Sequence, residues 1–400
     1  MSNLNELIKY IDEQRIIQIA SDLMRFKSDN PSTTDLENHS NETGIANYIL
    51  DFFKSVGIEA YSQAAFFNRV NVIACLKGVS KLGVPSIAFN GHMDVVPAGD
   101  LSLWDHDPYD PWLKDGKLYG RGACDMKGSI ACFMHVMELI KEHHIPHDED
   151  IWFTAVIDEE KSNKGVNALL QSSFKADRCI VGEASSCEIL IGHRGVLAFE
   201  IEIPGIACHA AMTATGQGRN AILDAIKVIK SIENVDIKLH EEKSEMLGFS
   251  QLNVTGFASG IKVNVIPDKA VLQIDGRTAL GEKLEDIQNL VASELDALKD
   301  NGEILSYKIK PTTFCPSYEL PLDSSFLRTA KSAAEKIGID PKVSVFGATC
   351  EASLIAKSCP EVIIFGAGSL KQAHNSNEFV PVDELVKTAQ FYLACLLENK

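Results

Sequence analysis

The sequence predicts an α/β protein with a mixed, mostly parallel main sheet flanked by helices and a smaller ferredoxin-like α+β domain inserted into it. Short apolar segments alternate with segments of helical periodicity over residues 1–192 and again over 311–400. Such alternation is typical of strand–helix–strand units. Between these ranges the order changes to strand, helix, two strands, helix and strand, the order of a ferredoxin-like unit.

The main domain is expected to begin with helices, because apolar residues recur at helical spacing over 4–27 and 43–55. Four strands and two helices are expected next, with strands near 69–77, 85–91, 151–157 and 178–181 and helices near 126–143 and 164–171. After the insertion the same alternation predicts helices near 323–337, 349–357 and 381–398 and strands near 342–346 and 361–366.

The inserted domain is expected to cover 193–310, with Pro311 marking the return of the chain to the main domain. Its predicted strands lie near 195–203, 250–259, 269–278 and 304–311, and its predicted helices lie near 218–233 and 283–299. The main domain is therefore expected to comprise 1–192 and 311–400.

Composition excludes several classes of partner. The formal net charge of −17 argues against nucleic acid or an anionic membrane surface, because phosphate binding needs clustered Lys and Arg. No run approaches the roughly 18 apolar residues that a membrane span needs, and the N-terminal segment has no signal-peptide pattern. The ten cysteines are scattered without a CxxC pair, which favours reduced thiols and a cytoplasmic protein.

Polar residues follow the predicted strands of the main domain at the places where ligands bind in open α/β sheets. They are His92, Asp94, Asp125, Glu159, Glu160, Glu183 and His374. Each alone has an ordinary explanation, such as a helix N-cap or a solvated pair of acids. Gathered at one edge, however, these carboxylates would repel one another without cations, so their joint occurrence predicts a two-metal cluster.

Five motifs in order carry a family resemblance. They are GHMDVVP (91–97), YGRGACDMKG (119–128), DEE (158–160), GEAS (182–185) and AH (373–374). The chain resembles the dizinc amidohydrolase family of acetylornithine deacetylase, succinyl-diaminopimelate desuccinylase, aminoacylase and glutamate carboxypeptidase. The resemblance covers essentially the whole chain, inserted domain included.

The resemblance implies a set of metal ligands. One zinc would be held by His92, Asp125 and Glu183, and the other by Asp125, Glu160 and His374, with Asp125 bridging. Nitrogen and oxygen ligands of this kind suit zinc, although they do not distinguish zinc from cobalt. Asp94 would fix the tautomer of the His92 imidazole, since alternate residues of an extended segment share a face.

The resemblance also implies a mechanism. Glu159 would be the general base that takes a proton from a water bridging the two zincs and returns it to the leaving amine. The hydroxide would attack the amide carbonyl of a small N-acyl amino acid, and no covalent intermediate would form.

The inserted domain carries three further candidates by resemblance. His209, in GIACHAA, would stabilise the tetrahedral oxyanion in the partner subunit's active site, so a homodimer through the inserted domain is expected. Arg277 would form a bidentate pair with a substrate carboxylate, and Asn264 would place an amide near the same group. A hinge near 190–194 and 309–312 would let the domains close on substrate.

The substrate is expected to be N-acetylornithine, which would place the protein in arginine biosynthesis. The segments FGATCEASLIA (346–356) and FGAGSLKQAHNSNEFV (365–380) resemble those of acetylornithine deacetylases. Glu351 offers a negative charge that suits an ornithine ammonium. The alternatives are a succinyl-diaminopimelate desuccinylase or another N-acyl-amino-acid or dipeptide hydrolase of the same family.

Three rival interpretations are open. A cysteine hydrolase would use Cys124 or Cys350, although buried cysteines are commonly inert packing. A nucleotide-binding enzyme would use the glycines at 120 and 122 or at 366 and 368, but neither pair has the third glycine of the dinucleotide motif. A non-catalytic binding paralogue would keep the fold and dimerise, and turnover would separate it from an enzyme.

Overall fold

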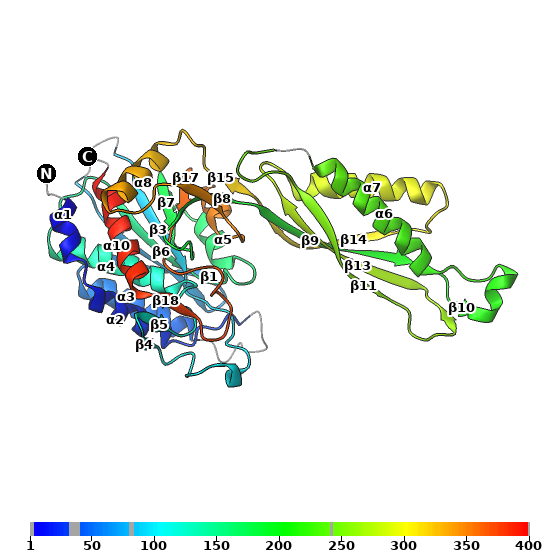
Figure 1. Cartoon of the computed structure of the whole chain (residues 1–400), viewed down its shortest axis with the longest axis horizontal. Coiled ribbons are helices and arrows are strands. Elements are labelled where there is room, and N and C mark those ends of the chain that lie inside the picture. Colours follow the sequence, from blue (N-terminus) through cyan, green and yellow to red (C-terminus); the bar gives the residue numbers. More distant parts are fainter. Residues whose placement is uncertain (1–3, 32–40, 80–83, 241–242, 399–400) are drawn as a thin grey trace. The chain divides into compact units, whose positions relative to one another are not determined.

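A computed structural model of the chain describes residues 4–31, 41–79, 84–240 and 243–398. The chain divides into two compact units (Figure 1), Met1–Gly192 with Leu320–Lys400 and His193–Glu319. The second unit ends later than the predicted boundary at 310. Pro311 lies inside β14 (Lys308–Cys315), opposite Phe199, so the predicted return to the main domain at this residue is wrong. The hinge near 190–194 and 309–312 stays a prediction. β14 is an edge strand, where proline is tolerated because its missing N–H leaves no neighbour unpaired.

The first unit is built on a sheet that has nine strands in the described residues, of which β15 (Tyr318–Glu319) falls at the end of the second unit's range. The central strands β6, β3, β7 and β17 are parallel, and antiparallel pairs lie on both sides of them. This is the mixed, mostly parallel α/β architecture that the sequence predicts. The sheet order is β1-β2-β6-β3-β7-β17-β8-β15, with β16 beside β8. The strands are β1 (Glu59–Phe66), β2 (Arg69–Leu76), β3 (Ile87–His92), β6 (Ile151–Val156), β7 (Arg178–Val181), β8 (Ile189–His193), β15 (Tyr318–Glu319), β16 (Val343–Phe346) and β17 (Glu361–Ile364).

Helices of the first unit bury an apolar layer against this sheet. The helices are α1 (Leu4–Leu7), α2 (Glu13–Met24), α3 (Glu42–Ser55), α4 (Lys127–Glu142), α5 (Lys164–Gln171), α8 (Ser325–Lys336), α9 (Ala352–Ile355) and α10 (Val382–Leu397). Helix α4 packs against α2 and α10 and is buried along most of its length. Phe133 of α4 stacks on Phe89 of β3 at 4.7 Å and on Tyr392 of α10 at 4.2 Å, so aromatic contacts join helices to strand.

The structure differs from the predicted elements where local capping or short strands intervene. The predicted helix 4–27 is split into α1, a 3₁₀ turn at Ile8–Tyr10 and α2, because Asp12 caps α2 by accepting the N–H groups of Gln14 and Arg15. Strands β1 and β8 were not predicted. A small sheet of β4 (Trp112–Lys114), β5 (Lys117–Tyr119) and β18 (Phe379–Pro381) was also missed, since its strands are only three residues long.

The second unit has the predicted βαββαβ order. It contains β9 (Gly195–Pro204), α6 (Ala221–Leu239), β11 (Gln251–Ser259), β13 (Lys269–Thr278), α7 (Leu284–Asp300) and β14, with a short ribbon of β10 (Cys208–His209) and β12 (Val265–Ile266). The sheet order is β11-β13-β9-β14, all antiparallel. Alternate residues of β9 are buried, and with α6 and α7 they form one apolar core that includes Leu197, Phe199 and Val228.

Further predictions concern membrane spans, the cysteines and the location of the protein. Among the residues that the structure describes, no helix is long and apolar enough to cross a membrane. The cysteines are free thiols, and most of them are buried. The cytoplasmic location stays a prediction.

Candidate metal centre

Three neighbouring parallel strands bring the predicted ligands to one edge of the sheet. His92 is the last residue of β3, Glu160 follows β6, and Glu183 follows β7. Strand β3 lies between β6 and β7 in the sheet, with His92 opposite Val156. Because the carboxyl ends of parallel strands meet at one edge, residues distant in sequence converge there.

Asp125 lies between the two predicted histidine ligands. Its Oδ1 is 2.9 Å from His92 Nε2, and its Oδ2 is 3.2 Å from His374 Nε2. Glu160 Oε2 is also 3.1 Å from His374 Nε2. One carboxylate thus presents one oxygen to each side of the site, which is the placement that the resemblance assigned to a bridging ligand.

The backbone fixes the orientation of the His92 ring. Its Nδ1 donates a hydrogen bond to the backbone carbonyl of Asp94 at 2.8 Å, so Nε2 faces Asp125 and lies 3.9 Å from Glu183 Oε1. The sequence predicts that the Asp94 side chain sets the tautomer, but the backbone carbonyl of Asp94 does so instead. The Asp94 carboxylate is 3.8 Å from Nδ1. The Asp94 carbonyl oxygen thus lies closer to the His92 ring than the Asp94 carboxylate does.

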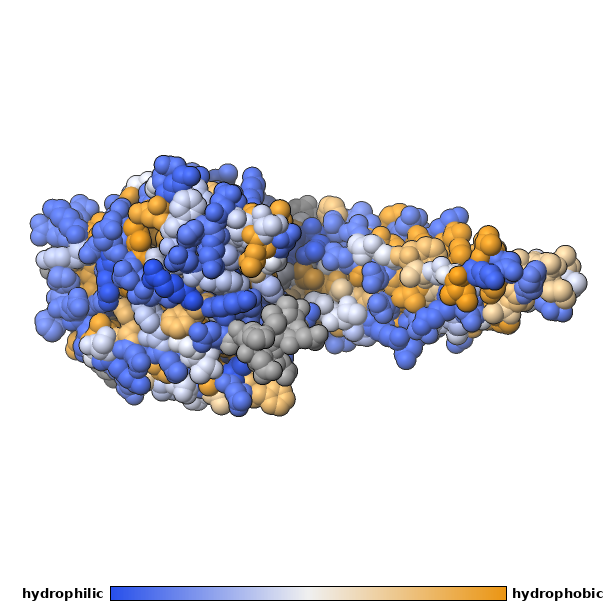
Figure 2. All heavy atoms as spheres, turned by 90° about the horizontal axis from the view of Figure 1, so that it is seen from below, coloured by the Kyte–Doolittle hydropathy of each residue, from blue (hydrophilic) through white to orange (hydrophobic). Residues whose placement is uncertain are grey.

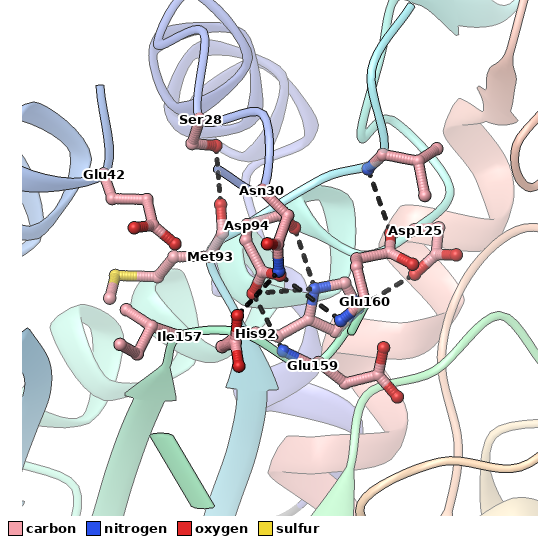
Figure 3. Close-up of polar contacts among 12 residues, drawn as sticks. Ser28, Asn30, Glu42, His92, Met93, Asp94, Asp125, Ile157, Glu159 and Glu160 are labelled. Atoms are coloured by element: carbon pink, nitrogen blue, oxygen red, sulfur yellow. Dashed lines mark hydrogen bonds and ion pairs between the residues drawn. The ribbon is translucent and has the colours of Figure 1, made fainter. Parts of the chain in front are cut away.

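The Asp94 carboxylate instead holds the backbone of the two glutamates. It accepts hydrogen bonds from the N–H of Glu159 at 3.2 Å and of Glu160 at 3.3 Å. It also accepts a 2.7 Å bond from the side-chain amide of Asn30. Figure 3 shows Asp94 between Asn30 and these two glutamates. Asp94 therefore positions the segment that carries the predicted base and one predicted ligand.

The acids at this edge are held in an environment that disfavours their charge. Burial raises the pKa of Glu159 and of Glu183 well above the usual value, and the neighbouring carboxylates add to the shift while His92 opposes it. Burial also raises the pKa of Glu160, helped by the charge of Asp125. Burial and mutual repulsion both disfavour the charged forms of these carboxylates, as is common at functional sites.

At His374 and Asp125 the pKa shifts favour the charged form of each side chain. Hydrogen bonds to Asp125 and Glu160 raise the pKa of His374 to about 10. Burial would raise the pKa of Asp125, but the hydrogen bonds from His374 and His92 outweigh it and lower that pKa. The donor set fits a metal ion, since ligand atoms of His92, Asp125 and Glu160 lie within 4.8 Å of one another.

Glu378 holds the backbone of Asp125 and was missed from the sequence. It is fully buried, and it accepts the N–H groups of Asp125 at 3.1 Å and Cys124 at 2.8 Å. Arg121 donates to the same carboxylate at 2.6 Å. A charged residue shortly after His374, directly before the strand FVP, is the signal that could have indicated it.

Glu351 lies in the first unit but is 1% exposed. Its Oε2 accepts a 2.7 Å hydrogen bond from the Asn90 amide, two residues before His92. Burial raises the pKa of Glu351 to about 7, with His92 and Asn90 opposing the shift. The carboxylate is therefore enclosed beside the strand that carries His92, and its role toward a substrate ammonium stays a prediction.

The three candidates of the inserted domain lie in the second unit. His209 and Asn264 are brought together, with their side chains 3.4 Å apart and the N–H of Ala210 bonded to the Asn264 carbonyl. Arg277 lies on β13 and is paired with Asp275 at 3.1 Å, with its side chain 42% exposed. His209 is exposed, and Asn264 is half-buried.

The cysteine interpretation has no support in the geometry. Cys124 is fully buried and donates to the Ser369 carbonyl at 3.2 Å. Burial raises the pKa of Cys124 well above its usual value, so the thiol stays protonated. Cys350 is also buried.

Comparison with known proteins identifies the family of this chain. The pattern described as peptidase family M20/M25/M40 matches residues 88–398, which is more than half of the chain. The chain belongs to this family. As an M20 protein it is a hydrolase, and the matched range includes every candidate ligand.

Curated relatives of this M20 protein are succinyl-diaminopimelate desuccinylases. The one from Rickettsia bellii (strain RML369-C) is 29% identical over 371 residues, covering 89% of this chain and 92% of the relative. The one from Cupriavidus pinatubonensis (strain JMP 134 / LMG 1197) is 32% identical over 312 residues, covering 75% and 79%. These findings do not show the predicted closeness to acetylornithine deacetylase.

Solved structures share the fold. Aminopeptidase PepT from Bacillus cereus ATCC 10987 has a TM-score of 0.80 at 23% identity, covering 97% of this chain and 99% of that chain. A dinuclear metal-binding M20 peptidase from Bacillus subtilis has a TM-score of 0.69 at 17% identity, covering 96% and 97%. At these identities the likeness shows the α/β architecture alone.

Proposed function

We propose that this M20 protein hydrolyses the amide bond of a small N-acyl amino acid with the help of two divalent metal ions. The observation that carries the proposal is the placement of Asp125 between His92 and His374, with Glu160 and Glu183 at the outer sides. His92, Asp125 and Glu183 would hold one ion, and Asp125, Glu160 and His374 the other. Zinc suits this donor set, and cobalt would be accepted as well.

The residues of the chain then have separate tasks. When bound, the metal ions would polarise the substrate carbonyl and make an attacking water more acidic. The Glu159 carboxylate takes a proton from that water and delivers it to the amide nitrogen as the bond breaks. Burial raises the pKa of Glu159, and the neighbouring carboxylates add to the shift. Asp94 keeps Glu159 and Glu160 in place through their backbone N–H groups.

The inserted unit would take part in the reaction through its three candidate residues. We propose that Arg277 binds a substrate carboxylate, that Asn264 supports the same group and that His209 stabilises the oxyanion in a partner subunit of a homodimer. Exposed apolar residues support an association through this unit, namely Leu223, Ile226 and Ile237 on α6 and Phe257 on the edge strand β11. Figure 2 shows hydrophobic side chains among the hydrophilic ones on the face of this unit that is turned to the viewer.

N-succinyl-diaminopimelate is the first substrate to test, because curated relatives of similar length carry that activity in their names. N-acetylornithine is the second, because the GAGSLKQAH run resembles that of deacetylases. An ornithine ammonium is favoured less, since its expected partner Glu351 is buried.

The test is hydrolysis of a panel by the zinc- or cobalt-loaded protein, with Glu159→Gln as the matched control. The panel comprises N-succinyl-diaminopimelate, N-acetylornithine, other N-acetyl amino acids and a simple dipeptide. Turnover of one N-acyl amino acid that is lost in Glu159→Gln supports the proposal and selects the acyl group. Preference for the dipeptide would replace the substrate class while keeping the chemistry. Two bound metals without turnover would favour the non-catalytic paralogue.

A further inference from the structure

The turn that carries Glu159 and Glu160 begins at a residue in an unusual backbone conformation. Asp158 has a φ of +66°, which is the left-handed region that side chains other than glycine rarely adopt. Its carbonyl accepts the N–H groups of Ser162 at 3.1 Å and Asn163 at 2.6 Å. The direction in which the next two side chains leave the chain therefore depends on what holds Asp158.

A charged side chain from a distant strand holds it. Arg69, the first residue of β2, donates from Nη1 to Asp158 Oδ1 at 3.0 Å. Asp158 is fully buried, so this guanidinium neutralises a carboxylate that water does not reach. Lys164 is the other cation nearby, but its Nζ is farther away, at 3.7 Å from Oδ2.

Arg69 is itself held from its other side. Its Nη2 donates to Glu42 Oε1 at 2.7 Å, and its Nε contacts the second oxygen of the same carboxylate. Glu42 is the first residue of α3, and its side chain is 5% exposed, against 13% for Arg69. A two-point contact of this kind fixes the plane of the guanidinium. Arg69 therefore ties the turn to helix α3.

Asn30 joins this chain of contacts to the ligand side of the site. Its side-chain amide donates to Asp158 Oδ1 at 3.2 Å and to Asp94 Oδ2 at 2.7 Å. Figure 3 shows Asn30 above Asp94, with Glu42 on the side of the site away from Asp125. The turn is thus fixed at Asp158 through Arg69 and at Glu159 and Glu160 through Asp94.

We propose that Arg69 is a positioning residue for Glu159 and Glu160, acting through Asp158. The inference rests on the proposed function, because it assigns Arg69 to the placement of that general base and that ligand. Arg69 touches none of the reacting atoms, and it acts by keeping the Asp158 turn in its left-handed form. A misplacement of about 1 Å of a catalytic group can cost about 100-fold in rate.

The first experiment compares Arg69→Met with Arg69→Lys. In Arg69→Met we expect kcat to fall about 100-fold while KM changes less than about threefold, because base placement and not substrate binding is lost. Arg69→Lys keeps the charge without the fork, and we expect it to recover about a tenth of the wild-type kcat. Arg25→Met is the matched control, since Arg25 is 51% exposed and pairs with a neighbour on its own turn. Equal kcat in Arg69→Met and wild type would overturn the proposal.

A second pair of variants tests the other partner of this contact, the Asp158 side chain. Asp158→Asn keeps an acceptor for Arg69, whereas Asp158→Gly removes the side chain that Arg69 holds and lets the backbone leave the left-handed conformation freely. We expect Asp158→Asn to retain most of kcat and Asp158→Gly to lose about as much as Arg69→Met. The double variant Arg69→Met/Asp158→Gly should lose no more than either single variant, because both remove the same contact. Full activity of Asp158→Gly would also overturn the proposal.

A spectroscopic readout keeps the inference separate from the proposed function. The visible absorption of bound Co²⁺ reports the geometry of its ligands, of which Glu160 would be one. We expect Arg69→Met to change that spectrum and to weaken Co²⁺ binding by at least tenfold, as outer contacts to ligands usually do. An unchanged spectrum and affinity would overturn the positioning role even if no substrate is turned over. An inactive wild type with a changed spectrum in Arg69→Met would overturn the proposed function alone.

Discussion

The two units of the chain treat charge in opposite ways. In the first unit, ionisable groups such as Asp94, Asp158 and Glu378 are fully buried at the carboxyl edge of the sheet. In the second unit the core is a single apolar cluster from four strands and two helices. Its candidate polar residues, including Arg277 and His209, are accessible from solvent.

This difference predicts which of the two units depends on bound cations for its stability. Buried carboxylates destabilise a fold unless they are paired or bind a cation. The first unit is therefore expected to depend on bound metal ions for part of its stability. The second unit buries few charges and is expected to be stable without them. The following predictions test that contrast, beginning with the largest expected effect.

Removal of the predicted base should abolish activity while leaving the first unit intact. Glu159→Gln keeps the size of the side chain but cannot take a proton, so we expect kcat to fall by about 10²–10⁴-fold. Metal content per chain and the melting temperature should stay within error of wild type. The measurement is steady-state kinetics with metal analysis on the same sample. Loss of metal in this variant would show that Glu159 is a ligand instead.

Glu351 should make the stability of the first unit pH-dependent. Its pKa is raised from 4.5 to about 7 by burial, so the stability it contributes is present below its unfolded pKa and is lost as the pH rises through about 7. Glu351→Gln keeps an acceptor for Asn90 and does not ionise. We expect the variant to gain roughly 3 kcal/mol relative to wild type between pH 4.5 and pH 8.

Urea unfolding of both proteins in chelator at several pH values measures this difference. Glu188→Gln is the matched control, because Glu188 is an exposed acid of the same unit. A difference between Glu351→Gln and wild type that does not vary with pH would mean that Glu351 is already ionised in the folded protein. Glu351 would then not count among the buried acids that distinguish the first unit from the second.

Metal binding should stabilise the first unit selectively. An ion that binds only the folded state at 100 times its Kd adds about 2.7 kcal/mol. We therefore expect zinc addition to raise the unfolding temperature of chelator-treated protein. Hydrogen exchange should show the added protection at β3, β6 and β7 and little at β9 and β13. Equal protection in both units would break the contrast between them.

Much of the fold was predictable because it follows from local patterns. Helix α5 and strands β7 and β13 have the predicted boundaries, since their apolar periodicity and flanking turns are clear. Strand β1 was missed because it is mostly exposed and its apolar residues do not alternate regularly, and β8 because only Arg194 separates it from β9. The return at Pro311 was misplaced because an edge strand accommodates proline.

The site was predictable in its members and less so in its contacts. Motifs identified the residues that converge at the sheet edge, because strand ends in a parallel sheet must meet there. They could not show that the Asp94 carbonyl, and not its carboxylate, bonds His92. Nor could they show Arg69, Asn30 and Glu378, whose roles arise from contacts between residues distant in sequence. The burial of Glu351 depends on the same three-dimensional packing.

The smallest expected effect on stability concerns Arg277 of the second unit. Its ion pair with Asp275 is solvent-exposed, and such pairs contribute about 0–1 kcal/mol. We therefore expect Arg277→Met to unfold within about 1 kcal/mol of wild type in urea. If Arg277 binds a substrate carboxylate, the same variant should lower kcat/KM about 100-fold, since a charge-assisted bidentate contact is lost. Lys269→Met is the matched control, because Lys269 also pairs at the surface of β13, with Glu202. A large loss of stability in Arg277→Met would mean that its partner depends on it in the fold, and the contrast between a charge-dependent first unit and a charge-independent second unit would no longer hold.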